Sequence, residues 1–260
     1  MISETFGTKN IAALGDYSIF VWRSIKSLRR LWARRGLFLS QCEFIGVTSS
    51  GIILVSAIFL GAVLGYQLYI TLHAFGTEAL LGGAVGVSLF RDLAPVMTAI
   101  MVTGRAGAAI AAEIATMRVS EQIDAMEIMA VDPLEYLVAP KIIAGIIMVP
   151  LLSVFFAAIG SLAAKFVACD IMDLSVATYW TQFTIMVDVN ELYHCTLKGA
   201  FFGGILTSVG CYCGFTAKGG AGGVGLATRR TVVLSCLSIL LVDYILTSFL
   251  PFGYNWLMVE

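Results

Sequence analysis

Residues Phe44–Leu72 read FIGVTSSGIILVSAIFLGAVLGYQLYITL and contain no charged side chain. A helix of about 20 mostly apolar residues crosses the hydrocarbon core of a bilayer, so this segment predicts a membrane-spanning helix. Four further segments have the same character: 79–112, 142–164, 199–217 and 231–252. The sequence therefore predicts an all-α polytopic membrane protein with five transmembrane helices.

The overall composition agrees with this assignment and excludes several other classes. Of the 260 residues, 59% are hydrophobic and 13% are charged, and the mean hydropathy is +0.91. A soluble domain carries about 25% charged residues, so a disordered chain and a typical cytosolic enzyme are excluded. Six cysteines are too few for a secreted disulfide scaffold. The net charge of −1 gives no reason to expect nucleic acid as a partner.

The distribution of Lys and Arg predicts the orientation, because cytoplasmic loops carry an excess of both. Seven precede the first span, three lie near the end of the second or after it (Arg105, Arg118 and Lys141) and three follow the fourth, whereas only Lys165 and Lys198 fall on the opposite side. This bias predicts a cytoplasmic N-terminus and a C-terminus on the outer side. The expected boundaries are a cytoplasmic segment 1–43, one transmembrane domain 44–253 and an outer tail 254–260.

The N-terminal segment is expected to contain a helix that lies in the cytoplasmic headgroup layer. Val21, Ile25, Leu28 and Trp32 recur at helical spacing, with basic residues mainly between them. No compact apolar core follows an early basic region, so a cleaved signal peptide is not expected. A solvated basic leader is the alternative interpretation.

Glycines at four-residue spacing within the expected spans predict close helix packing, because small residues let backbones approach in lipid. The pairs are Gly61/Gly65, Gly82/Gly86, Gly199/Gly203 and Gly210/Gly214. A different glycine motif, Gly220-x-Gly222-x-x-Gly225, matches the dinucleotide fingerprint, but that fingerprint requires a preceding strand. We expect a flexible cytoplasmic turn there. The chain has no G-x-x-x-x-G-K-[ST] motif, so any ATP that drives it is expected to bind another chain.

Metal and nucleophile chemistry find little support in the sequence. His73 and His194 have no partner fixed by spacing, and Cys211-Tyr212-Cys213 is best interpreted as packing. No metal site and no cofactor are expected on this chain. Cys169 and Cys195 fall in or beside the same expected outer loop, which leaves a disulfide open.

Charged residues inside the spans are the strongest candidates for function. Arg91, Asp92 and Asp243 interrupt apolar segments, and Lys198 lies at the outer edge of the fourth span. A charge near the centre of a bilayer costs about 2.5–3.5 kcal/mol, so such groups pair or line a wet cavity. Two positive and two negative groups allow a neutral cluster, which is either a structural ion pair or a polar wall beside a substrate pathway.

The loop between the second and third spans is the only sizeable internal cytoplasmic loop. A helix over about 118–131 is expected there, because Val119, Ile123, Met126 and Ala130 share one face and Val131-Asp132-Pro133 ends it. A generic surface helix would look similar. A membrane protein without its own motor nevertheless needs a surface to which a separate motor protein can bind.

Three motifs of the chain resemble the MlaE (YrbE) family, the permease subunits of bacterial ABC transporters for phospholipids. The strongest match is the series Gly-Arg-Ala-Gly, Glu-Ile, Met-Arg, Glu-Gln, Met-Glu and Ala-Val-Asp-Pro within Gly104–Pro133. Leu89–Pro95 resembles the family's Arg-Glu-Leu-Gly-Pro segment, with Asp92 in place of Glu, and Ala227–Val233 resembles the signature before the last span. The similarity covers roughly residues 15–253.

The resemblance implies a homodimer in the bacterial inner membrane, with a lipid cavity between protomers. It implies a cytoplasmic ABC ATPase dimer that binds ATP and Mg²⁺, with room for a small regulatory subunit, and an outer ring of MCE-domain proteins. Arg91, Asp92, Lys198 and Asp243 would face the cavity. Its apolar walls would include Leu64, Tyr66, Leu68, Tyr69, Leu72 and Phe75. The ATPase-coupling residues would be Arg118, Val119, Glu121, Gln122, Ile123, Met126, Glu127 and Ala130.

The expected function is that of a non-enzymatic permease subunit in phospholipid transport between the inner membrane and an MCE-type carrier system, which maintains outer-membrane lipid asymmetry. One alternative is a secondary transporter that uses Arg91, Asp92 and Asp243 as a proton relay. Another is a membrane-embedded lipid-modifying enzyme with Asp and His as acid and base. The two alternatives predict activity of this chain alone.

Overall fold

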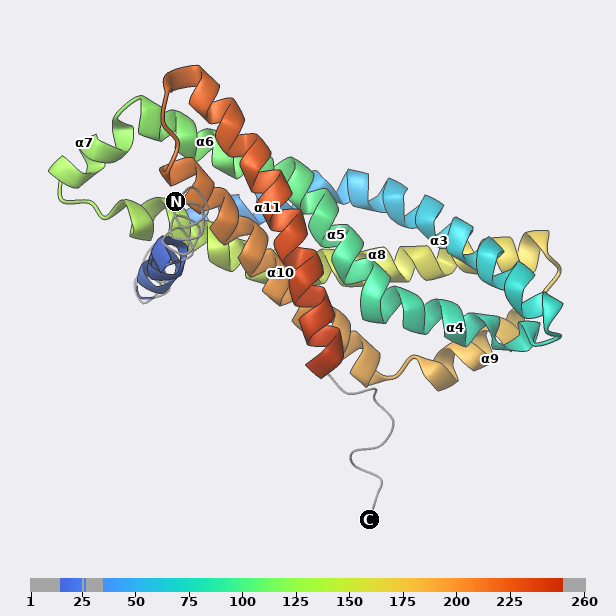
Figure 1. Ribbon diagram of the computed structural model, residues 1–260. Helices are drawn as coiled ribbons and strands as arrows, with labels where there is room; N and C mark the ends of the chain where they lie inside the picture. The colour runs from blue at the N-terminus through green and yellow to red at the C-terminus, as the bar shows by residue number, and fades with distance from the viewer. Residues whose placement is uncertain (1–14, 25, 27–34, 250–260) are drawn as a thin grey trace, which may run out of the picture.

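The computed structural model describes residues 15–24, 26 and 35–249, and every regular element within them is helical (Figure 1). The α-helices are α2 (Arg35–Cys42), α3 (Thr48–Ala74), α4 (Leu81–Ser88), α5 (Ala94–Val102), α6 (Ala108–Val119), α7 (Gln122–Ile128), α8 (Ala139–Lys165), α9 (Val176–Met186), α10 (Val189–Phe215) and α11 (Gly220–Phe249). They are joined by π-helical turns η2 (Glu43–Val47), η4 (Leu89–Leu93), η5 (Thr103–Gly107), η6 (Leu134–Val138) and η7 (Phe166–Ile171), and by the 3₁₀ turn η3 (Glu78–Leu80). The all-α prediction is confirmed.

Four helical segments of the described chain are long and apolar enough to cross a membrane. They are 36–74, 78–119, 134–171 and 220–249, and they contain most of the predicted spans 44–72, 79–112, 142–164 and 231–252. Each helix begins earlier than predicted, and the first three also end later. Hydropathy detects only the apolar part of a helix, whereas hydrogen bonding continues into its polar ends.

The predicted span 199–217 lies almost entirely in α10, which is 27 residues long but is not among these four segments. It packs against α8, α6 and α11, and 15 of its residues are buried. A helix surrounded by protein can carry Gly, Ser, Thr and Cys where a lipid-facing helix carries large aliphatic residues. The fifth span therefore stays a prediction.

Two local predictions are wrong. The glycines Gly220, Gly222 and Gly225 do not form a flexible turn, because they lie in the first turns of α11. The helix expected over 118–131 is shorter, since α6 continues to Val119 and α7 covers only Gln122–Ile128. The expected outer connection after the third span is mostly helical, in η7, α9 and the start of α10, and its placement on the outer side stays a prediction.

The expected headgroup-layer helix is described only in part, because Ile25, Leu28 and Trp32 lie outside the described residues. Residues 15–24 and 26 are helical, and they lie at the same end of the molecule as α7 (Figure 1). The end of α3 and α9 lie at the opposite end. The two ends of the molecule are therefore built from different parts of the chain.

The four glycine pairs mark close helix contacts, as predicted. Gly61/Gly65 and Gly199/Gly203 face α8, Gly82/Gly86 face α9 and the residue after it, and Gly210/Gly214 face α6 and η5. A Cβ added at any of these glycines would lie between 2.0 and 3.2 Å from an atom of the neighbouring segment. The backbones approach so closely that no larger residue fits without movement of the neighbour.

Candidate functional site

Three helical segments bring three charged residues and one threonine together in a group that we call the charge cluster: Asp92, Lys198, Asp243 and Thr247. The Lys198 Nζ atom donates to Asp92 Oδ1 at 2.5 Å and to Thr247 Oγ1 at 2.9 Å. It also lies 3.0 Å from Asp243 Oδ1. Asp92 comes from η4, Lys198 from α10, and the other two residues from α11. The ion pair between Lys198 and the shorter Asp92 side chain therefore closes.

The members of the charge cluster differ in exposure. The Lys198 side chain is 1% exposed, that of Asp243 is 22% exposed and that of Asp92 is 47% exposed. A buried ammonium group is stable only with close partners, because its desolvation costs several kcal/mol. Lys198 therefore holds the three segments together, and Asp92 is the most accessible of the three charged members in the single chain.

Arg91 forms an ion pair with a residue outside the charge cluster, although the sequence suggested one neutral group of four charges. Its Nη1 atom lies 4.0 Å from Oε1 of Glu191, and both side chains are 10% exposed. Arg91 and Asp92 follow one another in the π-helical turn η4, and consecutive helical residues point in different directions. The sequence analysis missed Glu191. Its only distinguishing feature is that it is the acidic residue in the first turn of α10.

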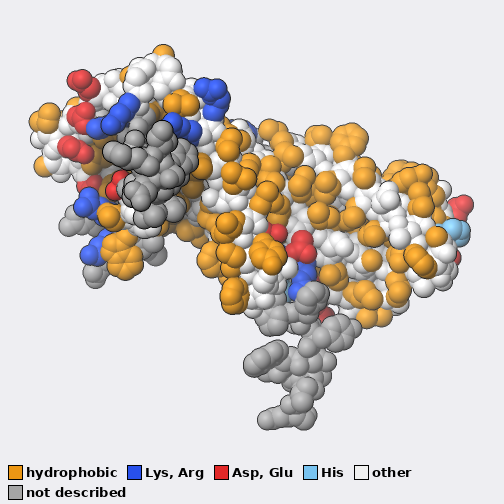
Figure 2. Space-filling model, viewed as in Figure 1, with side chains coloured by type: hydrophobic (Ala, Val, Ile, Leu, Met, Phe, Trp, Pro, Cys, Tyr) orange, Lys and Arg blue, Asp and Glu red, His pale blue; other side chains and the backbone are white. Residues whose placement is uncertain are grey.

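The charge cluster lies deep along the second helical segment. Asp92 is 14 residues from Glu78, which corresponds to about 20 Å of helix. Lys198 was expected at the outer edge of a span, but α10 begins beside η4 and places it at the depth of Asp92. In Figure 2, hydrophobic side chains cover the body of the molecule and a small group of acidic and basic side chains interrupts them.

The six apolar residues suggested as cavity walls lie on different sides of α3 and its end. Leu64, Leu68, Tyr69 and Leu72 are half-buried and pack against the core. The Tyr69 hydroxyl donates to the Met172 carbonyl oxygen at 3.1 Å. The other two residues, Tyr66 and Phe75, are 48% and 78% exposed. These two are the most exposed of the six, so they are the most accessible to a ligand.

The suggested ATPase-coupling residues surround α7. Arg118 and Val119 end α6, and Glu121 adopts a left-handed conformation with φ of 59° immediately before α7. Arg118 Nη1 forms an ion pair with Asp124 Oδ1 across this turn. Gln122 and Glu127 are exposed on α7. The loop thus presents several polar side chains on a short, defined helix.

The apolar face predicted for this loop is wrong in part. Ile123 is fully buried and Met126 packs against the core, whereas Val119 and Ala130 are exposed. Ala130 has φ of 57° and lies in the turn after α7, so it cannot continue the helical face. The exposed apolar residues at the tip are instead Ile128 and Met129, at 87% and 67% exposure. In the sequence, Ile128 and Met129 were recognisable only as apolar residues that do not lie on the predicted apolar face.

A second set of polar contacts ties the start of the first helical segment to the rest of the chain. Lys141 Nζ, which is buried, lies 2.8 Å from Glu113 Oε2 and 3.2 Å from Gln41 Oε1. Arg105 Nη1 donates to the Phe44 carbonyl oxygen and to Ser49 Oγ, both at 2.9 Å. The sequence analysis counted both basic residues as loop charges. Instead they connect α2, η2 and α3 to α6, η5 and α8.

The described residues contain no group of three or more His, Cys, Asp or Glu side chains that could hold a metal ion. All six cysteines are free thiols, so Cys169 and Cys195 are not bridged. Within the described chain no strand precedes Gly220, which removes the structural context that a dinucleotide site requires.

Comparison with known proteins shows what the chain is similar to. A family model described as Permease MlaE matches residues 38–249. A probable ABC transporter permease of Rickettsia conorii is 37% identical over 249 residues, which cover 95% of this chain and 96% of that protein. The intermembrane phospholipid transport system permease protein MlaE of Haemophilus influenzae is 38% identical over 91% of each chain. The chloroplastic protein TRIGALACTOSYLDIACYLGLYCEROL 1 of Arabidopsis thaliana is 33% identical over 81% of this chain and 60% of its own.

Proposed function

Because this chain belongs to the MlaE permease family, we propose that it is the permease subunit of an ABC transporter for phospholipids. The observation that carries this proposal is the similarity to the Haemophilus phospholipid transport permease over 91% of both chains. The family model matches residues 38–249, a range that includes the charge cluster, α7 and nearly all of the four candidate spans. The chain itself is a transport subunit, and ATP would be hydrolysed on a partner chain.

The substrate pathway that we propose combines apolar helices with the charge cluster. Phospholipid tails cannot cross water cheaply, since each exposed CH₂ costs about 0.8 kcal/mol. Two chains that pair through their exposed apolar surfaces would enclose a chamber for the tails. Exposed Tyr66 and Phe75 and half-exposed Asp92 support this model, because they are accessible to a lipid at the surface of one protomer. The paired Lys198 would then fix Asp92 in place.

The assembly that we propose follows the family. Two copies of this chain, five spans each, lie in the bacterial inner membrane with the N-terminus in the cytoplasm. An ATPase dimer contacts α7, and MCE-domain proteins receive or deliver lipid on the outer side, so that the system maintains outer-membrane lipid asymmetry. Exposed Ile128 and Met129 beside polar Gln122 and Glu127 support α7 as the docking surface, because apolar residues ringed by polar ones mark protein contacts.

Purification from native membranes into lipid nanodiscs tests the function. We expect two copies of the chain to co-purify with an ATPase dimer, and we expect native mass spectrometry to detect bound phospholipid. Lipid transfer should stop when the ATPase partner is made inactive. Gradient-driven transport or lipid conversion by this chain without an ATPase would overturn the proposal in favour of the secondary transporter or the enzyme.

Substitution at α7 tests the coupling role. Arg118→Ala removes the ion pair with Asp124, and Glu121→Ala alters the exposed residue before α7. Both should lower lipid-stimulated ATP hydrolysis by the assembled complex. Lys218→Ala, an exposed basic residue in the turn between α10 and α11, is the matched control. Unchanged hydrolysis and assembly in both variants would show that this loop does not couple.

A further inference from the structure

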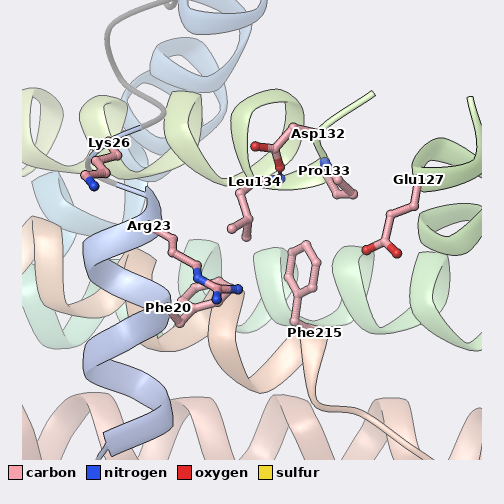
Figure 3. Close-up of a pocket in the computed structure, with 8 residues that line it drawn as sticks. All are labelled: Phe20, Arg23, Lys26, Glu127, Asp132, Pro133, Leu134 and Phe215. Atoms are coloured by element: carbon pink, nitrogen blue, oxygen red, sulfur yellow. Dashed lines mark hydrogen bonds between the residues drawn. The ribbon is translucent and has the colours of Figure 1, made fainter. Parts of the chain in front are cut away.

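A cavity of about 490 Å³ lies between the N-terminal helix, the segment after α7 and the end of α10. Its volume falls within the range of roughly 300–1,000 Å³ that is usual for small-molecule sites. Phe20, Leu134 and Phe215 supply its apolar lining. Figure 3 shows that Arg23 and Glu127 point from opposite sides into the space between these three side chains. The function proposed above places one lining residue, Glu127, at the docking surface of α7, but it assigns no ligand to this cavity.

The charges that line the cavity are balanced and come from opposite walls. Arg23 and Lys26 come from the N-terminal helix, and Glu127 and Asp132 come from α7 and the segment that follows it. Among the described residues, Glu127 and Asp132 form no ion pair with a basic side chain. Asp132 Oδ1 accepts a hydrogen bond from the Leu134 backbone N–H at 2.9 Å, which fixes that carboxylate at the wall. The cavity thus offers cations on one side and carboxylates on the other.

The N-terminal helix is held in place on one side and open on the other. The Tyr17 hydroxyl lies 2.7 Å from Ser208 Oγ. The centroid of the Phe20 ring lies 5.7 Å from that of the Tyr212 ring and 5.6 Å from that of the Phe215 ring. On the outward side, Ile19 and Trp22 are 55% and 64% exposed. Exposed tryptophan and aliphatic residues beside basic ones are typical of a helix in the interfacial layer of a membrane. This exposed face supports a position of the helix, and of the cavity beside it, near the level of lipid headgroups.

We infer that this cavity binds the headgroup of a zwitterionic phospholipid whose amine is a primary ammonium, as in phosphatidylethanolamine. The phosphate would contact Arg23 and Lys26, because guanidinium and ammonium groups form strong charge-assisted hydrogen bonds with phosphate oxygens. The ammonium group would donate to Glu127 and Asp132 and lie near the Phe20 and Phe215 rings, which attract cations. An anionic headgroup would pair only with Arg23 and Lys26. It would leave the carboxylates of Glu127 and Asp132 without a cation.

This site is separate from the charge cluster and does not depend on the transport proposal. It joins the N-terminal helix to the segment that carries α7, so an occupied cavity would hold the two together. A soluble phosphoethanolamine compound has the same headgroup chemistry as the lipid. The membrane source is favoured because the outward face of the helix carries Ile19 and Trp22.

Hydrogen–deuterium exchange of the full-length chain, with its co-purifying partners in nanodiscs, tests the inference. One set of nanodiscs contains phosphatidylglycerol alone, and a second contains phosphatidylethanolamine and phosphatidylglycerol. Exchange in residues 15–24 should be about tenfold slower in the second set, as mass action gives when the lipid is near ten times its Kd. Arg23→Gln and Glu127→Gln should each abolish this difference, and the control Lys218→Gln should retain it.

Three results would overturn the inference. Equal exchange in the two nanodisc sets would show that no ethanolamine headgroup binds. Retention of the difference in Glu127→Gln would show that Glu127 does not bind the ammonium group, which overturns the proposed carboxylate wall. Equal protection in phosphatidylglycerol nanodiscs with soluble glycerophosphoethanolamine at the same concentration would overturn the assignment to a membrane lipid. The readout is local exchange rather than transport, so failure here is distinguishable from failure of the proposed function.

Discussion

The two C-terminal helices, α10 and α11, are similar in length but lie in different surroundings. In α10, 15 of 27 residues are buried, whereas in α11 only five of 30 are buried. The buried residues of α11 recur every fourth position, Gly223, Ala227, Thr231, Ser235 and Ile239, and the same stripe continues to Asp243 and Thr247. The rest of α11 exposes large aliphatic residues. The hydropathy of a helix therefore reflects its surroundings. The more buried helix, α10, is not among the segments apolar enough to cross a membrane, whereas α11 is.

Loss of the buried Lys198 ammonium group from α10 should have the largest effect on the free energy of unfolding. Lys198→Met leaves the Asp92 and Asp243 carboxylates without their cation, and breaking a buried ion pair costs about 3–5 kcal/mol. Equilibrium unfolding in mixed micelles measures the change. The control is Lys165→Met, which removes a more exposed pair with Asp170 and should cost no more than about 1 kcal/mol. Equal effects of the two variants would contradict the burial of Lys198.

Truncation of one leucine on each helix compares their packing directly. Leu206 of α10 is fully buried and Leu237 of α11 is 60% exposed. Leu206→Ala should destabilise the chain by about 2–5 kcal/mol, as large-to-small changes in cores do. Leu237→Ala should cost less than about 0.5 kcal/mol in the same unfolding measurement. A large effect of Leu237→Ala in the assembled complex, but not in the single chain, would place Leu237 in the contact between protomers.

Insertion of a methyl group tests the close contact between α10 and α8. A Cβ at Gly203 would lie 2.1 Å from the Gly145 carbonyl oxygen, so Gly203→Ala should cost about 1–3 kcal/mol through overpacking. At Gly222 of α11 no atom lies within 4 Å of an added Cβ. Gly222→Ala should therefore be neutral or raise the thermal midpoint, because Ala favours helix over Gly. A neutral Gly203→Ala would mean that the two helices do not approach as described.

The smallest expected change concerns the N-terminal helix. Tyr17→Phe removes the contact with Ser208 and should cost about 0.5–1.5 kcal/mol, whereas Tyr244→Phe, at a 75% exposed residue, should cost nothing measurable. Burial raises the pKa of the Tyr17 phenol, so the hydroxyl stays protonated in the folded chain. The difference between the two variants should therefore be constant below the ordinary tyrosine pKa of about 10 and should shrink above it. Unfolding curves at several pH values give both results.

The membrane helices and their glycine contacts could be predicted from the sequence, because apolar length and four-residue glycine spacing have direct physical causes. The ends of the helices could not, since polar residues extend them. The partner of Lys198 could be anticipated because an intramembrane charge needs one. Glu191 as the partner of Arg91 could not, because the sequence does not show that Arg91 contacts the first turn of α10 while Asp92 contacts Lys198, seven positions further along the same helix.

The α7 segment shows a second limit of sequence patterns. Val119 and Ala130 fit an apolar helical face by spacing, but the chain leaves the helical conformation at Glu121 and again at Ala130. Two left-handed residues are enough to move Ile128 and Met129 to the surface. Positive φ at non-glycine residues has little sequence signature, so the exposed tip could be identified only from the structure.

The second helical segment runs from Glu78 to Val119 without a loop. Asp92 and Arg118 are 26 positions apart on it, a separation of about 40 Å along the axis. One of them holds Lys198, and the other holds α7 through Asp124. The π-helical turn η5 lies near the middle of this stretch, and the helix continues through it. In the proposed complex, the helix itself would therefore connect the α7 end to Asp92 along one continuous segment.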